Sequence, residues 1–185
     1  MTTFMKNITK NGTRILRPDE LKKLINAIDK MEMRDKFEAL FYTGARYTEI
    51  QRIYDNPEWF LDNSIHLQST KKKAIQNERY IRLNPAGKRA VTYMLRCRKK
   101  YPTRAGWNKN LIRWSKKAGL DPKGISTKTT RKTWESYLVT SYPKQLEYIF
   151  LSQGHSQLTS LKFYLMLPFT NEEKEQIKFY TGDWI

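Results

Sequence analysis

The apolar residues of this chain recur at helical spacing along most of its length and change to strand alternation in one region. Residues 21–28 carry Leu and Ile three and four positions apart, which places them on one face of a helix. Ile65 and Leu67 instead alternate with polar residues, and residues 80–83 repeat that alternation after a basic interval. The pattern predicts a mainly α fold with a small antiparallel β-sheet (α+β).

Prolines, glycines and polar clusters divide the rest of the chain into further elements. The expected helices cover residues 18–28, 37–43, 46–50, 85–98, 107–118, 130–141, 143–153, 157–165 and 171–179. Residues 1–17 are polar and basic with an Asn11-Gly12 turn signal, and they are predicted to form an arm or linker. A length of 185 residues then fits one domain over residues 18–185.

The charge balance points to a polyanionic partner. The chain has 35 Lys and Arg against 18 Asp and Glu, a net charge of +17. A surplus of this size repels itself in a compact state, and nucleic acid is the commonest partner that relieves the repulsion. A lysine-rich surface that only confers solubility, or attraction to an anionic membrane, are the alternatives on charge alone.

Cysteine and histidine usage argues against a disulfide framework or a transition-metal centre. Cys97 is the single cysteine, and His66 and His155 are far apart in the sequence. No apolar run approaches the length of a membrane span, and the N-terminus lacks a signal-peptide pattern. We expect a cytoplasmic protein without cofactor or metal.

Tyr164 lies nine residues after the Gly154-His155 pair and is a candidate nucleophile. A tyrosine that attacks a DNA phosphate forms a covalent phosphotyrosine. Such a site must neutralise the nonbridging oxygens, for which arginine is suited, and must protonate the leaving oxygen, for which lysine or histidine is suited. The alternative is that Tyr164 is a core residue, because Leu161 and Leu165 flank it at helical spacing.

Motifs that could supply these groups occur in order along the chain. They are FYTGARYTEI with Arg46 and Glu49, STKKKAIQNERYIRL with three adjacent lysines, STKTTRKTWESYL with Lys128 and Arg131, and LSQGHSQLTSLKFYL with His155 and Tyr164. Together they resemble the catalytic domain of the tyrosine recombinases, whose patterns are TGxR with a following acid, a lysine between two strands, HxxR, GH, and a tyrosine nine residues beyond. The tail YLMLPFTNEEKEQIKFYTGDW further resembles the ends of integrases from archaeal viruses and plasmids.

The resemblance implies a role for each matching residue. Arg46 and Arg131 would hold the scissile phosphate, His155 would hydrogen-bond a nonbridging oxygen, and Tyr164 would be the nucleophile. Lys71 would be the general acid for the 5′-oxygen, with Lys73 as second choice and Lys72 as third.

Two positions beside these carry separate expectations. Lys128 stands where the HxxR pattern has histidine. A lysine there can donate to phosphate, and burial beside the arginines would be needed to lower its pKa enough for it to act as a base. Glu49 is expected to orient Arg46, and His66 is expected to be a strand residue without a catalytic role.

The implied function is site-specific DNA recombination, as in the integrase of a virus or mobile plasmid, through a 3′-phosphotyrosyl intermediate without ATP or metal. The implied partner is double-stranded DNA, with four protomers assembled on two sites and a monomer expected off DNA. The segment after Tyr164 is expected to dock on a neighbouring protomer. Family members carry an N-terminal helical clamp domain, and residues 1–17 are too short to form it.

Two other functions stay open at this point. One keeps the fold but acts as a topoisomerase-like relaxase or a decayed integrase that only nicks and reseals. The other is a basic architectural DNA-binding protein with no covalent step. The set of Arg46, Arg131, His155 and Tyr164 argues against the second, because binding alone requires no such combination.

Overall fold

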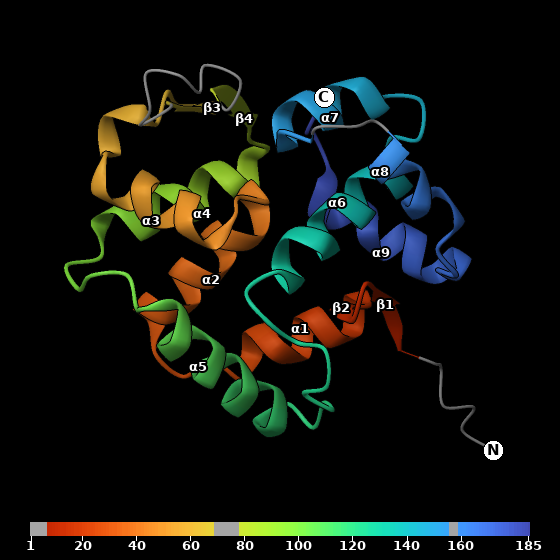
Figure 1. Ribbon diagram of the computed structural model, residues 1–185, viewed down its shortest axis with the longest axis horizontal. Helices are drawn as coiled ribbons and strands as arrows, with labels where there is room; N and C mark the ends of the chain where they lie inside the picture. Colours follow the sequence, from red (N-terminus) through yellow and green to blue (C-terminus); the bar gives the residue numbers. More distant parts are fainter. Residues whose placement is uncertain (1–6, 69–77, 156–158) are drawn as a thin grey trace.

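The computed structural model describes residues 7–68, 78–155 and 159–185 (Figure 1). Its elements, in chain order, are β1 (Ile8–Lys10), β2 (Thr13–Ile15), α1 (Pro18–Asn26), α2 (Met31–Thr43), α3 (Tyr47–Asp55), η1 (Pro57–Trp59, a 3-10 turn), β3 (Ser64–Leu67), β4 (Arg79–Arg82), α4 (Pro85–Arg96), α5 (Arg104–Lys117), α6 (Thr129–Ser141), α7 (Leu146–Gln153), α8 (Thr159–Lys162), η3 (Phe163–Met166, a 3-10 turn) and α9 (Asn171–Thr181). The prediction of a mainly helical chain with little antiparallel sheet is confirmed.

The predicted hairpin is formed by β3 and β4, which pair antiparallel with Ile65 opposite Ile81 and His66 opposite Tyr80. The alternation places Ile65 and Ile81 in the core, where both are buried. His66 contacts Glu78 through Nε2 at 2.6 Å and stacks on the Tyr80 ring at 4.5 Å. Its partners are therefore those of a strand residue at the protein surface.

The prediction of an arm or linker over residues 1–17 is wrong for its described part. β1 and β2 form a second hairpin, and Ile8, Ile15 and Leu16 are buried in the core. Both backbone polar groups of Leu16 are bound to α6. Its N–H donates to Thr133 Oγ1 at 3.0 Å, and its carbonyl accepts from the Tyr137 hydroxyl at 3.0 Å. Strands of three residues are too short to produce a recognisable hydrophobic period.

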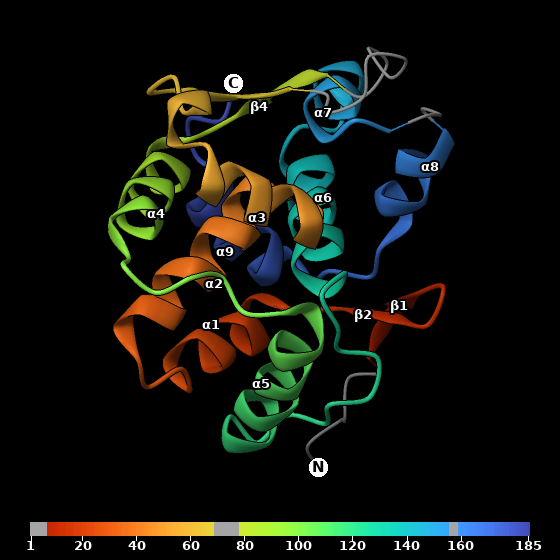
Figure 2. The same cartoon turned by 60° about the vertical axis from the view of Figure 1, so that its left-hand side comes forward.

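Helix α6 is the centre of the core. Figure 2 shows it between α3 on one side and α8 on the other. Trp134, Tyr137 and Leu138 are fully buried on it. Phe41 of α2 meets the Trp134 ring edge-on at 5.2 Å and the Tyr137 ring at 6.0 Å, so α2 and α6 are joined through aromatic packing.

The expected helix over residues 157–165 differs from the structure. The chain forms the short helix α8 and then the 3-10 turn η3, so that Tyr164 belongs to the tighter turn. The expected helix over residues 143–153 begins later, at Leu146. Elements of one turn give helical spacing without a full amphipathic face, which is why the sequence pattern could not separate them.

The segment after Tyr164 packs against its own chain, and its docking on a neighbouring protomer stays a prediction. α9 lies against α6 (Figure 1), and Ile177 and Trp184 are fully buried. The Trp184 indole N–H donates to the Arg82 carbonyl at 3.2 Å, and Glu173 pairs with Arg17 at 2.7 Å. The C-terminal end therefore closes the core in cis.

Among the residues that the structure describes, no helix is long and apolar enough to cross a membrane.

Trp184→Ala should lower the free energy of unfolding by about 3–5 kcal/mol, because it opens a cavity and leaves the Arg82 carbonyl without its indole donor. Phe179→Ala is the matched control, since Phe179 is 88% exposed whereas Trp184 is fully buried. We expect this control to change stability by less than about 0.5 kcal/mol. Urea unfolding of both variants measures the difference, and equal losses would contradict docking of the C-terminal end in cis.

Candidate active site

A cationic pocket of about 390 Å³ lies where β1, α3, α5, α6, the turn after α7 and η3 converge. Its wall is formed by Lys10, Arg46, Tyr47, Thr48, Arg104, Thr127, Lys128, Arg131, Lys132, Glu135, His155 and Tyr164. The pocket therefore brings together Arg46, Lys128, Arg131, His155 and Tyr164, which the sequence analysis selected from three separate stretches. Lys71, Lys72 and Lys73 lie outside the described residues.

Arg131 is held by backbone carbonyls at two helix ends. Its Nη1 donates to the Gly44 carbonyl at 2.9 Å and its Nη2 to the Gln153 carbonyl at 2.5 Å. Its Nε donates to Glu135, one helical turn further along α6, at 2.8 Å. Burial lowers the pKa of the guanidinium, although the carboxylate of Glu135 opposes this. Three fixed contacts leave the side chain little freedom to move.

Gly44 is required where α2 ends, because its φ of 58° lies in the left-handed region. A Cβ on Gly44 would approach Gln153 Oε1 to 2.1 Å and Trp134 Cδ1 to 2.6 Å. The glycine of the TGxR motif thus lacks the side chain that would keep α2 and α6 apart, and its carbonyl accepts a hydrogen bond from Arg131.

Arg46 stands at the start of α3 with its side chain 51% exposed toward the pocket. Its Nη1 donates to Glu49 Oε1 at 2.7 Å and its Nη2 to the Gly154 carbonyl at 3.2 Å. Glu49 also receives two bonds from Arg79 of β4, at 3.1 and 2.9 Å. The expectation that Glu49 orients Arg46 agrees with these contacts, and Arg79 is a partner that the sequence analysis missed.

The carboxyl of Glu49 is held in its ionised form. Burial opposes ionisation, but the hydrogen bonds and charges of Arg79 and Arg46 outweigh it and lower the pKa of Glu49 to about 2. Glu49 is thus a fixed negative charge that ties α3 to β4.

Glu135 is the residue that joins the predicted groups, and the sequence analysis did not select it. The carboxylate is almost fully buried on α6. Its Oε1 accepts from Arg131 Nε at 2.8 Å and contacts His155 Nε2 at 2.9 Å, and its Oε2 accepts from the Tyr164 hydroxyl at 2.9 Å. Burial disfavours ionisation, yet the charge of Arg131 and the bonds from His155 and Tyr164 keep the pKa of Glu135 below its ordinary value.

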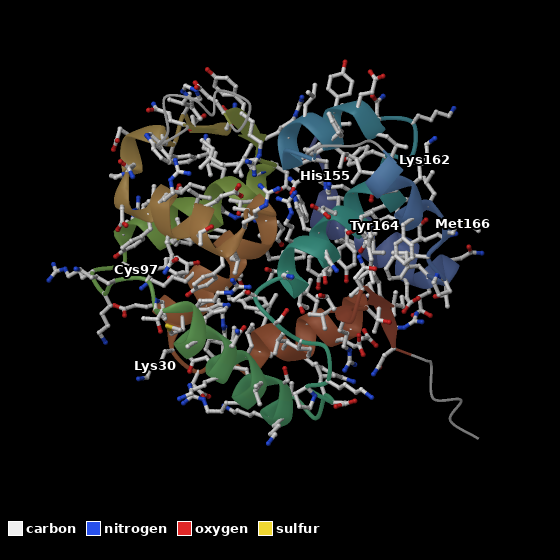
Figure 3. All side chains as sticks on the ribbon, in the orientation of Figure 1. Lys30, Cys97, His155, Lys162, Tyr164 and Met166 are labelled. Carbon is white, nitrogen blue, oxygen red and sulfur yellow. The ribbon has the colours of Figure 1, made fainter. Side chains whose placement is uncertain are left out.

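Tyr164 is 2% exposed, and its hydroxyl donates a hydrogen bond to Glu135. Figure 3 shows His155 and Tyr164 in the last part of the chain, and both line the pocket. Burial, and then the charge of Glu135 and the bond to it, raise the pKa of Tyr164 far above its ordinary value. The ammonium group of Lys10 lies 4.2 Å from the centre of the Tyr164 ring. The tyrosine is therefore protonated and held between a carboxylate and a cation.

Lys128 is exposed at the start of α6, so the burial that would be needed for it to act as a base is absent. Its neighbour Lys132 donates from Nζ to the Lys10 carbonyl at 2.5 Å and so fixes β1 against α6. This contact carries Lys10, which the sequence analysis assigned to an arm, into the wall of the pocket.

Sequence signals for the missed residues exist but are weak. Glu135 is a lone acid inside the apolar Trp134–Leu138 stripe, four positions after Arg131, and a buried acid at that spacing predicts an ion pair. Arg79 and Lys10 gave no signal, because their contacts depend on how β4 and β1 are placed relative to helices distant in the sequence.

Among the described residues, no group of three or more His, Cys, Asp or Glu side chains is arranged to hold a metal ion.

Gly44→Ala should destabilise the protein by more than Gly119→Ala, the matched control. Both glycines have positive φ, at 58° and 70°, but a Cβ on Gly119 meets nothing within 4 Å. We expect about 1–2 kcal/mol for the control from backbone strain and at least about 2 kcal/mol more for Gly44→Ala from the clash with Trp134 and Gln153. Urea unfolding compares the two, and equal losses would mean that α2 and α6 can separate without cost.

The pKa of Glu49 predicts a specific loss of stability in acid. Because its folded pKa of about 2 lies below the ordinary value of 4.5, its ionisation stabilises the fold above pH 4.5, and this contribution is lost as the pH falls toward 2. The loss should reach about 3 kcal/mol. Glu49→Gln should remove this part of the pH dependence, which urea unfolding from pH 6 to pH 2 measures. An unchanged slope in the variant would contradict the assigned pKa.

Solved structures with the same fold come from DNA recombinases and integrases. The Tn1549 transposon integrase (residues 82–397) in complex with circular intermediate DNA superposes with a TM-score of 0.68 at 18% identity, over 90% of this chain and 66% of that one. XerA recombinase superposes with a TM-score of 0.67 at 18% identity, over 94% and 67%. XerH recombinase bound to its difH substrate gives 0.63 at 17% identity, over 100% and 58%.

This chain thus spans about two thirds or less of the length of those structures. No protein-family profile matches it, and no curated protein matches it. The similarity in structure extends over nearly the whole chain, and it establishes that this chain has the fold of the tyrosine recombinase catalytic domain.

Proposed function

We propose that this protein is a site-specific DNA recombinase of the integrase type, which breaks and rejoins DNA strands through a covalent bond between Tyr164 and a 3′-phosphate. The observation that carries the proposal is the shared carboxylate. Tyr164, Arg131 and His155 converge on Glu135 at the wall of a cationic pocket, with Arg46 on the same wall. A protein that only binds DNA has no need to bury a tyrosine hydroxyl among groups suited to phosphate.

The pocket suits a phosphodiester. An arginine guanidinium has five N–H donors. Arg131 donates three of them to Gly44, Gln153 and Glu135, which leaves the others for nonbridging oxygens of a phosphate. Arg46 is half exposed and adds a second guanidinium that can bind two phosphate oxygens. In the proposed reaction these two arginines and His155 hold the scissile phosphate, and Lys128 donates to the same or a neighbouring phosphate. The fixed positions of both arginines provide charge stabilisation without reorganisation.

In the proposed reaction the Tyr164 oxygen bonds to phosphorus, the bond from phosphorus to the 5′-oxygen breaks, and the leaving oxygen takes a proton. The proposed donor of that proton is Lys71, with Lys73 second and Lys72 third; all three lie outside the described residues. A 5′-hydroxyl of another strand reverses the step and releases the tyrosine. Because each step exchanges one phosphodiester for another, neither ATP nor a metal ion enters the balance.

The solved structures support DNA as the substrate, since the Tn1549 integrase and XerH were determined with DNA. The net charge of +17 agrees with it. As finer parts of the proposal, four copies act on two duplex sites and the protein is a monomer off DNA. The resemblance of the tail to integrases of archaeal viruses and plasmids supports a role in the integration of a viral or other mobile element.

Covalent trapping tests the proposal. Duplexes tiled across the DNA that flanks the gene, each nicked so that cleavage releases a short fragment, are incubated with the protein in chelator and resolved on a denaturing gel. We expect a slowly migrating protein–DNA band with the wild type and none with Tyr164→Phe. Tyr93→Phe, at an exposed tyrosine of α4, is the control and should keep the band.

Other outcomes separate the alternatives. Binding without any band from the wild type would favour an architectural DNA-binding protein. A band that survives Tyr164→Phe would place the nucleophile at another tyrosine. Strand cleavage and resealing with no exchange between two duplexes would favour the relaxase alternative.

A further inference from the structure

The geometry points to Glu135 as the group that accepts the proton of Tyr164 during strand cleavage. This inference rests on the proposed function and concerns a residue outside the motifs of the resemblance. It answers how Tyr164 loses its proton, because Lys128 is exposed, whereas Glu135 Oε2 lies 2.9 Å from the tyrosine hydroxyl. Proton transfer by a carboxylate requires this contact between heavy atoms.

The surroundings of Glu135 keep the free protein inactive. Arg131 and Lys132 face it from α6, His155 from the turn after α7, Lys10 from β1 and Tyr164 from η3. Four of these groups are cations or can become cations, so the carboxylate is ionised and the proton stays on the tyrosine. The buried tyrosine is therefore a poor nucleophile before DNA binds, because its hydroxyl keeps its proton.

A bound phosphodiester would change this balance. Its negative charge would lie against Arg131 and His155, two of the groups that stabilise the ionised Glu135. Two anions that share the same cations disfavour each other, so the affinity of Glu135 for a proton rises when phosphate occupies the pocket. The nearest proton is that of Tyr164. Binding of the substrate would thus favour transfer of the proton from Tyr164 to Glu135.

Cleavage moves one proton from Tyr164 to Glu135 and exchanges one bond to phosphorus for another. The Tyr164 proton moves to Glu135 Oε2 as the Tyr164 oxygen bonds to phosphorus. The bond from phosphorus to the 5′-oxygen breaks, and this oxygen takes a proton from the general acid proposed above, Lys71. In the reverse step Glu135 returns this proton to the tyrosine oxygen as the 5′-hydroxyl attacks. A single buried carboxylate therefore acts as base in cleavage and as acid in resealing.

Single-turnover cleavage of the trapping duplex by Glu135→Gln tests the inference. The amide keeps an acceptor for the Tyr164 hydroxyl but cannot accept its proton. We expect cleavage and resealing to slow about 100-fold or more, with unchanged DNA binding. The rate of the variant should rise in proportion to hydroxide concentration, because solvent must then take the proton. Glu38→Gln, at a half-buried carboxyl of α2, is the control and should cleave like the wild type.

A duplex with sulfur in place of the bridging 5′-oxygen distinguishes base from acid. A thiolate leaves without a proton, so this duplex should restore cleavage to a variant that lacks the general acid, such as Lys71→Ala, and should not restore it to Glu135→Gln. Restoration of Glu135→Gln would overturn the inference by placing Glu135 at the leaving group.

Further outcomes are equally decisive. Cleavage by Glu135→Gln within threefold of the wild type would show that Glu135 takes no proton, and faster cleavage would show that it only restrains Tyr164. Absence of covalent product from the wild type would instead overturn the proposed function itself.

If circular dichroism shows that Glu135→Gln is unfolded, a measurement on the wild type replaces it. The infrared difference spectrum between free protein and covalent complex should gain the C=O stretch of a protonated carboxyl. Its absence would overturn the inference.

Discussion

The buried carboxylate of Glu135 is the interaction on which the arrangement of the pocket depends. A carboxylate in the core is costly unless charges and hydrogen bonds compensate it, and here Arg131, His155 and Tyr164 do so. These partners come from α6, the turn after α7 and η3. Because loss of any one contact removes part of the compensation of this buried charge, the carboxylate holds together segments distant in sequence.

A second carboxylate performs the same task on the other side of the pocket. Glu49 binds Arg46 and Arg79 and thereby ties α3 to β4. The two networks meet at helix ends, where the carbonyl of Gly44 receives Arg131 and that of Gly154 receives Arg46. Both arginines are consequently placed before any ligand binds, which is the condition for electrostatic stabilisation of a developing charge.

The elements that the sequence predicted well are those with a strong local signal. Gly44 marked the end of α2, alternation of Ile65 and Ile81 with polar residues marked the hairpin, and the apolar stripe of α6 was evident. The short hairpin of β1 and β2 was missed because three-residue strands carry no period. At Tyr164 the sequence predicts α-helix where the structure has a 3-10 turn, since apolar residues have nearly the same spacing in one turn of either type.

By itself, the sequence determined the mainly helical fold and the identity of five residues that the pocket brings together, because periodicity and motif spacing are local properties of a chain. Only the tertiary structure decided that the C-terminal segment docks in cis, that Lys10 reaches Tyr164 from the N-terminal hairpin, and that Glu135 joins the site. These depend on contacts across more than a hundred positions or on burial of a charge. Both follow from how the helices pack, and no short stretch of sequence encodes them.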